Sequence, residues 1–163
     1  MGAGEPARGR PPAAGYYSPL RLSIKRHDPT VPLPLPATGG AAAFDQAASE
    51  TVDVPPHAIR LVGTGLVIGV PPGHFLAIFA RSSTPLKRGL MVANGVGVVD
   101  ADYCGPTDEV KVQVINVTDE VVTVARGDRI AQGIVLPAPA IEWDEVDEIQ
   151  APSRGGFGST GAR

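Results

Sequence analysis

Glycine and proline interrupt this chain too often for long helices to form. The 163 residues include 20 glycines and 17 prolines, and both residue types mark turns. Between these turns the chain alternates, most clearly at Glu109–Val117, where Val110, Val112 and Val114 point to one side. Such alternation is typical of a half-buried β-strand. Many short strands at close spacing predict an all-β sandwich or barrel.

Further strands are expected in six segments of the sequence. They are residues 20–25, 51–54, 59–70, 74–80, 121–124 and 130–136. Residues 81–89 are polar and contain a proline, so at most one short helix is expected there. Arg126-Gly127-Asp128 reads as the turn that joins the last two strands.

Composition bounds the class of protein. Hydrophobic residues make up 43% of the chain, enough for one domain with a core. The net charge of -3 opposes a general attraction to nucleic acid polymers. The single cysteine, Cys104, excludes an internal disulfide and is interpreted as a small buried side chain. No apolar run approaches the roughly 20 residues that span a bilayer, and Arg8 and Arg10 precede no apolar signal core. We therefore expect a soluble cytoplasmic protein with neither a membrane nor a nucleic acid polymer as partner.

Three regions differ in composition. Residues 1–18 are rich in Gly, Ala, Pro and Arg and are predicted to form a disordered N-terminal tail. Residues 19–150 carry the apolar periodicity and form the expected β domain. Residues 151–163 lose that periodicity and read as a flexible C-terminal tail.

The segment from Asn94 to Tyr103 is the first candidate for chemistry. Its glycines allow a tight turn and a close approach of the backbone to a ligand. Val98 and Val99 precede Asp100, which suggests a carboxylate held against a dry wall, where a general base is useful. A hairpin that reads a base, with an acid at its root, fits this pattern.

A second candidate is Arg81-Ser82-Ser83, directly after a hydrophobic strand. An arginine fork with two hydroxyls suits phosphate binding. The structural alternative is a helix start, with a serine as N-cap ahead of Pro85. Both can hold together, because helix N-termini also bind anions. Asp45, which follows an Ala/Gly run, reads on its own as a turn or cap residue.

Two more segments carry polar side chains with a possible role. Gln132 lies in an aliphatic strand and needs a polar partner if it is buried. The tail from Arg154 to Gly161 has one aromatic residue, Phe157, among Gly, Ser and Thr. A linker is the ordinary interpretation. An aromatic ring can also stack on a base while Arg and hydroxyls reach phosphates, so the tail could act as a lid.

Several other kinds of site are not supported. No Gly-x-x-x-x-Gly-Lys-Ser/Thr run is present, so the ordinary NTPase loop is absent. Gly95-x-Gly97 is not followed by a third glycine opening a helix, so a dinucleotide fold is not indicated. The three histidines lack ligand spacing for zinc.

Together, the five segments resemble, in order and spacing, the five motifs of the trimeric dUTP diphosphatases (dUTPases), over about Leu20 to Gly161. The resemblance implies a jelly-roll fold and a homotrimer whose active sites are shared between subunits. It also implies hydrolysis of dUTP to dUMP and pyrophosphate, which removes dUTP from the nucleotide pool and supplies dUMP for thymidylate synthesis.

The resemblance also implies roles for individual residues. Asp100 activates the water that attacks the α-phosphorus, and Asp45 reaches a Mg²⁺ ion through coordinated water. Asn94 and the backbone of Gly97, Val98 and Val99 read uracil, while Tyr103 lies against the deoxyribose. The other substrate contacts implied are Arg81, Ser82, Ser83, Lys111 and Gln132 in the domain, and Arg154, Phe157, Gly158, Ser159 and Thr160 in the tail.

The chain departs from the family pattern in three places. Asp45 is followed by Gln46 where leucine is usual. Residues 106–108 are inserted after the third motif and should lengthen the hairpin tip without moving Asp100. Arg154 lies two residues closer to Phe157 than is usual.

Two alternatives stay open. A dCTP deaminase shares the fold and the phosphate-binding loop, but its catalytic Glu on the strand after the third motif has no counterpart in Val110–Val114. A nucleotide-binding regulator could keep the fold without catalysis.

Overall fold

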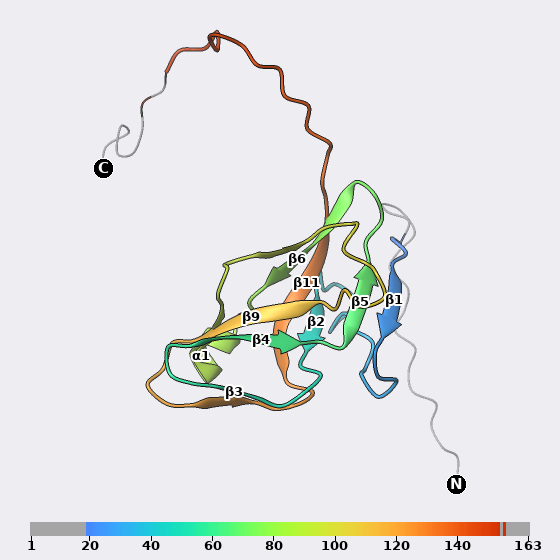
Figure 1. The fold of residues 1–163 in the computed structure, drawn as a ribbon, viewed down its shortest axis with the longest axis vertical. Coiled ribbons are helices and arrows are strands. Elements are labelled where there is room, and N and C mark those ends of the chain that lie inside the picture. The colour runs from blue at the N-terminus through green and yellow to red at the C-terminus, as the bar shows by residue number, and fades with distance from the viewer. Residues whose placement is uncertain (1–18, 154, 156–163) are drawn as a thin grey trace.

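The computed structural model describes residues 19–153 and residue 155, and in this range the chain folds almost entirely as β-strands (Figure 1). The elements in chain order are β1 (Ser23–Arg26), β2 (Phe44–Ala47), β3 (Val52–Val54), β4 (Ile59–Gly63), β5 (Leu66–Gly69), β6 (His74–Phe79), α1 (Thr84–Arg88), β7 (Leu90–Val92), β8 (Gly97–Val99), β9 (Lys111–Asn116), β10 (Val122–Val124) and β11 (Arg129–Pro137). The prediction of an all-β chain with one short helix is confirmed.

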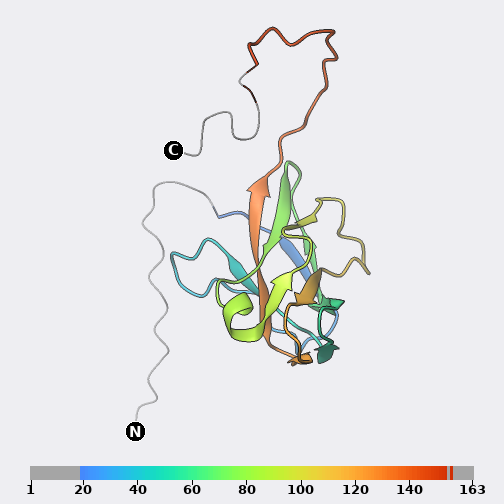
Figure 2. The ribbon, with the colours of Figure 1, turned by 90° about the vertical axis from the view of Figure 1, so that its left-hand side faces the viewer.

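The strands pair antiparallel in four sheets. The largest has the order β2-β11-β6-β8, the next has the order β4-β9-β7, and two pairs join β1 to β5 and β3 to β10. After β11 the Ala138 amide donates to the Gly73 carbonyl at 2.8 Å. Beyond that contact the chain leaves the strands and extends away from them (Figures 1 and 2). No helix within the described residues is long and apolar enough to cross a membrane.

The hydrophobic core lies between the sheets and follows the predicted alternation. Val110, Val112 and Val114 are buried, whereas Lys111 and Gln113 between them are exposed. Each fully buried valine stabilises the fold by about 1.5 to 3 kcal/mol relative to an exposed one. This packing fixes which face of β9 points outward, and that face contributes to the candidate site described below.

Helix α1 begins as predicted, but without a side-chain cap. Ser83 occupies the N-cap position and Pro85 the first turn, yet the Ser83 hydroxyl makes no capping hydrogen bond. The helix ends at Arg88 and is capped by Gly89, whose φ of 62° lies in the left-handed region that glycine tolerates. A side chain at position 89 would also collide with the methyl group of Thr118.

Three local expectations were wrong or incomplete. Phe44–Ala47, expected to be a loop, forms β2, and Leu90–Val92 forms the unpredicted strand β7. Cys104 is exposed rather than buried, because it lies in the turn beyond β8. For the two strands, tertiary pairing overrides a weak local signal.

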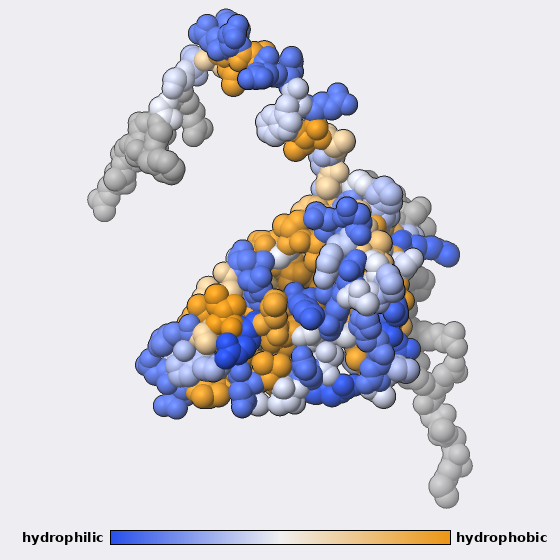
Figure 3. Space-filling model, in the orientation of Figure 1, coloured by the Kyte–Doolittle hydropathy of each residue, from blue (hydrophilic) through white to orange (hydrophobic). Residues whose placement is uncertain are grey.

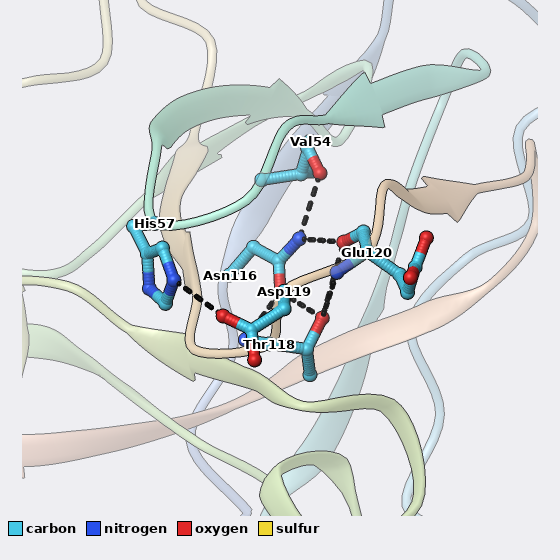
Figure 4. Close-up of polar contacts among 6 residues, drawn as sticks. All are labelled: Val54, His57, Asn116, Thr118, Asp119 and Glu120. Atoms are coloured by element: carbon cyan, nitrogen blue, oxygen red, sulfur yellow. Dashed lines mark hydrogen bonds and ion pairs between the residues drawn. The ribbon is translucent and has the colours of Figure 1, made fainter.

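A buried asparagine joins two turns at one end of the fold (Figure 4). Asn116 donates to the Val54 carbonyl at 2.9 Å and to the Glu120 carbonyl at 2.7 Å, and its Oδ1 accepts from the amide and hydroxyl of Thr118. Nearby, His57, whose φ is 56°, contacts the Asp119 carboxylate at 2.9 Å. Both the amide nitrogen and the amide oxygen of Asn116 have hydrogen-bond partners, so the side chain can be buried at little cost.

Candidate functional site

The predicted phosphate-binding residues gather around one cavity of about 430 Å³. Asp45 comes from β2, Gln132 from β11, and Arg81, Ser82 and Ser83 from the loop after β6. These segments are distant in sequence but belong to neighbouring strands of the largest sheet. We call this cavity the phosphate pocket.

The sheet register explains why these side chains meet. Gln132 lies opposite Asp45 on β2 and opposite Phe79 on β6. Residues directly opposite on antiparallel strands share a face of the sheet. Arg81, two positions after Phe79, continues on that face because strand side chains alternate.

Contacts within the phosphate pocket hold the Arg81 loop. The Arg81 Nε donates to the Asp45 Oδ1 at 2.7 Å, and both side chains are largely buried. The Gln132 Nε2 donates to the carbonyl of Ala80 at 3.0 Å. Gln132 therefore has a polar partner, as expected for a polar side chain in an aliphatic strand. Its hydrogen bond holds the backbone just before Arg81.

Arg129 contacts the same carboxylate from an adjoining cavity that it lines together with Asp45, and nothing in the sequence singled it out. Its Nη1 donates to the Asp45 Oδ2 at 3.0 Å. In a regular strand, residues three apart point to opposite faces. A register shift between Arg129 and Ala131 breaks that rule, so Arg129 and Gln132 lie on the same face. Two successive buried residues, Ile130 and Ala131, are the only local trace of this bulge.

The remaining predicted residues of the domain line a second cavity of about 340 Å³, which we call the hairpin pocket. Its walls include Asn94, Gly97, Val98, Val99, Asp100, Tyr103 and Lys111. Apolar side chains such as Ile78 and Val112 contribute to its lining, and polar groups from the hairpin and β9 complete it. A cavity in which apolar walls and convergent polar groups meet is typical of a ligand site.

Close packing shapes the hairpin at Gly97. A Cβ at this position would lie 3.1 Å from the Cβ of Ile78 and 3.8 Å from the Asn94 Nδ2. Glycine therefore lets β8 approach β6 closely and keeps the Asn94 amide next to bare backbone.

The inserted residues form a small closed turn. The Gly105 amide donates to the Asp108 Oδ2 at 2.7 Å, and the Tyr103 hydroxyl donates to the Glu109 carbonyl at 3.2 Å. The insertion thus lies beyond Tyr103, and the Tyr103 amide still turns back to the Asp100 carbonyl at 3.2 Å.

Asp100 is exposed in the single chain, which corrects the expectation of a carboxylate against a dry wall. Val98 next to it is 62% exposed. One copy of the chain therefore does not exclude water from this carboxylate.

The two pockets have no lining residue in common. Continuing the pairing of β6 with β8 places Asp100 at the level of Phe75, at the start of β6, whereas Arg81 follows its end. Six residues of extended chain span about 20 Å. One chain thus separates the candidate base from the candidate phosphate ligands.

The described residues contain no group of three or more His, Cys, Asp or Glu side chains that could hold a metal ion. The predicted tail residues Arg154, Phe157, Gly158, Ser159 and Thr160 lie outside the described residues.

Comparison with known proteins gives one consistent result. A sequence model of the dUTPase family matches residues 29–161. The deoxyuridine 5'-triphosphate nucleotidohydrolase of Caulobacter vibrioides is 41% identical over 150 residues, which cover 87% of this chain and 95% of that protein. The Streptococcus mutans dUTPase crystal structure aligns with a TM-score of 0.69 at 34% identity, over 75% of this chain and 98% of that one. A Staphylococcus bacteriophage 80alpha dUTPase with dUpNHpp has the same fold, with a TM-score of 0.76 at 22% identity, over 86% of this chain and 98% of that one.

Proposed function

The chain belongs to the dUTPase family, and we propose that it hydrolyses dUTP to dUMP and pyrophosphate in sites that copies of the chain build together. The observation that carries this proposal is the division of the predicted residues between two separate pockets. Each pocket holds one half of what the reaction needs. The hairpin pocket offers a base-reading turn and Asp100, whereas the phosphate pocket offers Arg81 and its neighbours.

An apolar surface beside the hairpin pocket supports assembly of more than one copy. Ile59, Leu61 and Met91 are between 46% and 57% exposed on the outer face of the β4-β9-β7 sheet. Ile59 and Met91 both lie opposite Ile115, and Leu61 itself lines the hairpin pocket. Figure 3 shows apolar side chains interrupting the polar surface on the face where β4 and β9 lie. A second copy seated here would bring its own residues to the hairpin pocket and cover Asp100.

The segment after β11 supports the same proposal. Ile141, Trp143 and Ile149 are at least 70% exposed on a stretch that leaves the strands. Packing of these side chains on a partner would remove their apolar surface from water. We propose a homotrimer, the state implied by the family, in which residues 151–163 close over a site with Phe157 on the base.

In this site, substrate recognition and chemistry fall to different residues. Asn94 and the backbone of Gly97–Val99 hydrogen-bond the polar edge of uracil, and the tight hairpin leaves no room for a methyl group on the base. Tyr103 packs on the deoxyribose, where a ribose hydroxyl would clash. Asp100 takes a proton from the water that attacks the α-phosphorus, and the proton transfer makes that water a stronger nucleophile.

The phosphate pocket of a neighbouring copy binds the triphosphate. Arg81, Ser82, Ser83 and Gln132 supply donors, with Lys111 as a further cation beside the hairpin. In the tail, Arg154, Ser159 and Thr160 add donors, while Gly158 allows close approach of the backbone.

The site fits a Mg²⁺ ion that is bound chiefly by phosphate oxygens and water. The described residues offer no carboxylate cluster, and Mg²⁺ keeps several waters when it binds with a nucleotide. Asp45 is the one carboxylate in the phosphate pocket and would accept hydrogen bonds from those waters. When bound, the ion offsets the negative charge that develops on the pyrophosphate leaving group.

The expected compartment is the cytoplasm, because the single cysteine leaves no internal disulfide that would need an oxidising one.

A substrate panel tests the proposed function directly. Purified protein is given dUTP, dTTP, dCTP or UTP with Mg²⁺, and pyrophosphate and ammonia are measured separately. Pyrophosphate from dUTP alone is expected. Ammonia from dCTP would identify a deaminase, and dUTP binding without either product would identify a regulator.

A further inference from the structure

One carboxylate in the phosphate pocket is shared by two arginines. The Arg81 Nε occupies the Asp45 Oδ1, and the Arg129 Nη1 occupies the Asp45 Oδ2. The Asp45 side chain is 18% exposed, the Arg81 side chain 24% and the Arg129 side chain 57%. Asp45 and Arg81 are therefore largely shielded from solvent, while the more exposed Arg129 reaches Asp45 from the adjoining cavity.

Stability alone does not account for the Arg129 contact. Ion pairs with an exposed partner contribute about 0 to 1 kcal/mol, since water competes and two side chains lose freedom. The bulge in β11 is nevertheless what turns Arg129 toward Asp45. Bulges that re-aim a side chain are common beside active sites.

Resting on the proposed function, we propose that Arg129 is a positioning residue. It holds the Asp45 carboxylate in place when Arg81 leaves that carboxylate to bind the triphosphate of the substrate. Arg81 cannot keep its present contact at full strength and also bind phosphate through the same nitrogen. When Arg81 turns away, Asp45 loses one of its two cations. A largely buried carboxylate without a cation is costly, and the Arg129 contact removes most of that cost.

The exchange has a consequence for metal binding. An Asp45 carboxylate anchored through Oδ2 keeps Oδ1 directed to the position that Arg81 vacates, so it can accept hydrogen bonds from water on the ion. Without Arg129, Asp45 retains Arg81 more tightly, and both the arginine and the carboxylate become less available to the nucleotide.

A double-mutant cycle tests this inference. Arg129→Gln, Asp45→Asn and the double variant are compared with the wild type by calorimetric titration with dUpNHpp, a non-hydrolysable dUTP analogue, in EDTA and over a Mg²⁺ series. Arg129→Gln should bind the analogue about tenfold more weakly, the loss expected when one partner of a charge-assisted contact is removed. Because Arg129 acts through Asp45, the double variant should bind like Asp45→Asn alone, within about twofold. Arg129→Lys, which keeps a charged donor, should recover most of the affinity.

Arg126→Gln is the matched control. Arg126 also pairs with an aspartate, Asp28, at 3.0 Å and is also exposed, but its guanidinium bonds Asp28, Thr30 and Ser49 rather than Asp45. The affinity of the Arg126→Gln variant for dUpNHpp should stay within about twofold of the wild-type value. A loss of the same size in this control would show that any surface cation on this side attracts the nucleotide, and it would overturn the inference.

Additive losses in the cycle, or wild-type affinity in Arg129→Gln, would also overturn the inference. If Arg129→Gln fails to fold by circular dichroism, Arg129→Ala in the same cycle gives the same discrimination. Failure of the proposed function is distinguishable, because the wild type would then release no pyrophosphate from dUTP whatever the result of the cycle.

Discussion

Asp100 is the side chain on which the proposed reaction depends, and it is exposed in one chain. The sequence pointed to Asp100 through its neighbours, two valines and two glycines. The sequence could not show that this part of the hairpin is exposed to solvent in one chain. Strand alternation indicates that a face is apolar, but it does not reveal which element or partner covers that face.

Asp100→Asn should remove turnover and preserve binding. The amide has the shape of the carboxylate but cannot accept the proton, so kcat should fall by about 10² to 10⁴. The Kd for dUpNHpp should change by less than about threefold, because the analogue contacts are unchanged. Steady-state kinetics and calorimetry measure the two effects, and near-wild-type kcat would remove Asp100 from its assigned role.

Gln46 departs from the rule that buried polar side chains are hydrogen-bonded. Its side chain is fully buried, and neither amide atom has a hydrogen-bond partner within the described part of the chain. A buried amide without partners costs roughly 1 to 3 kcal/mol.

Gln46→Leu should therefore raise the free energy of unfolding by about 1 to 3 kcal/mol, since leucine has a similar volume and no polar atoms to desolvate. Urea unfolding at fixed protein concentration measures the change. A less stable variant would mean that the Gln46 amide is satisfied by ordered water in the core.

At the scale of elements, periodicity predicted β9 because burial repeats every second residue there, whereas β6 and β11 were predicted from apolar runs with successive buried residues. Strand β2 was not predicted because alanines and glycines precede it and Asp45 interrupts its apolar pattern. Arg129 was missed for a related reason. A β-bulge changes the sheet face to which a side chain points but leaves almost no signal in the sequence. The contact between Arg129 and Asp45 could therefore be found only in the structure.

The Asn116 contacts make a prediction for the turns that they join. Asn116→Leu should lower the free energy of unfolding by about 2 to 4 kcal/mol, because the carbonyls of Val54 and Glu120 lose their donor in a buried place. The nearby Asp119→Ala should change it by less than about 0.5 kcal/mol, because the Asp119 side chain is 94% exposed. Equal losses in the two variants, measured by urea unfolding, would contradict this account.

At the scale of the whole molecule, the two separate pockets support the proposal that one chain does not complete a site. The sequence placed all the motifs on one chain, and the family resemblance supplied the sharing of sites between subunits. The structure adds a physical reason, because Asp100 and Arg81 stand near opposite ends of β6, about 20 Å apart along the strand.

Complementation between two inactive variants tests this central claim most directly. Asp100→Asn lacks the base and Arg81→Ala lacks the phosphate ligand, so each should be nearly inactive by itself. If sites form between copies, unfolding the two proteins together and refolding them as a mixture lets an intact Asp100 meet an intact Arg81 in about one quarter of the sites. We predict that dUTP hydrolysis returns to roughly one quarter of the wild-type rate in the refolded mixture. A mixture as inactive as its two components, with assembly confirmed by light scattering, would contradict a site shared between chains.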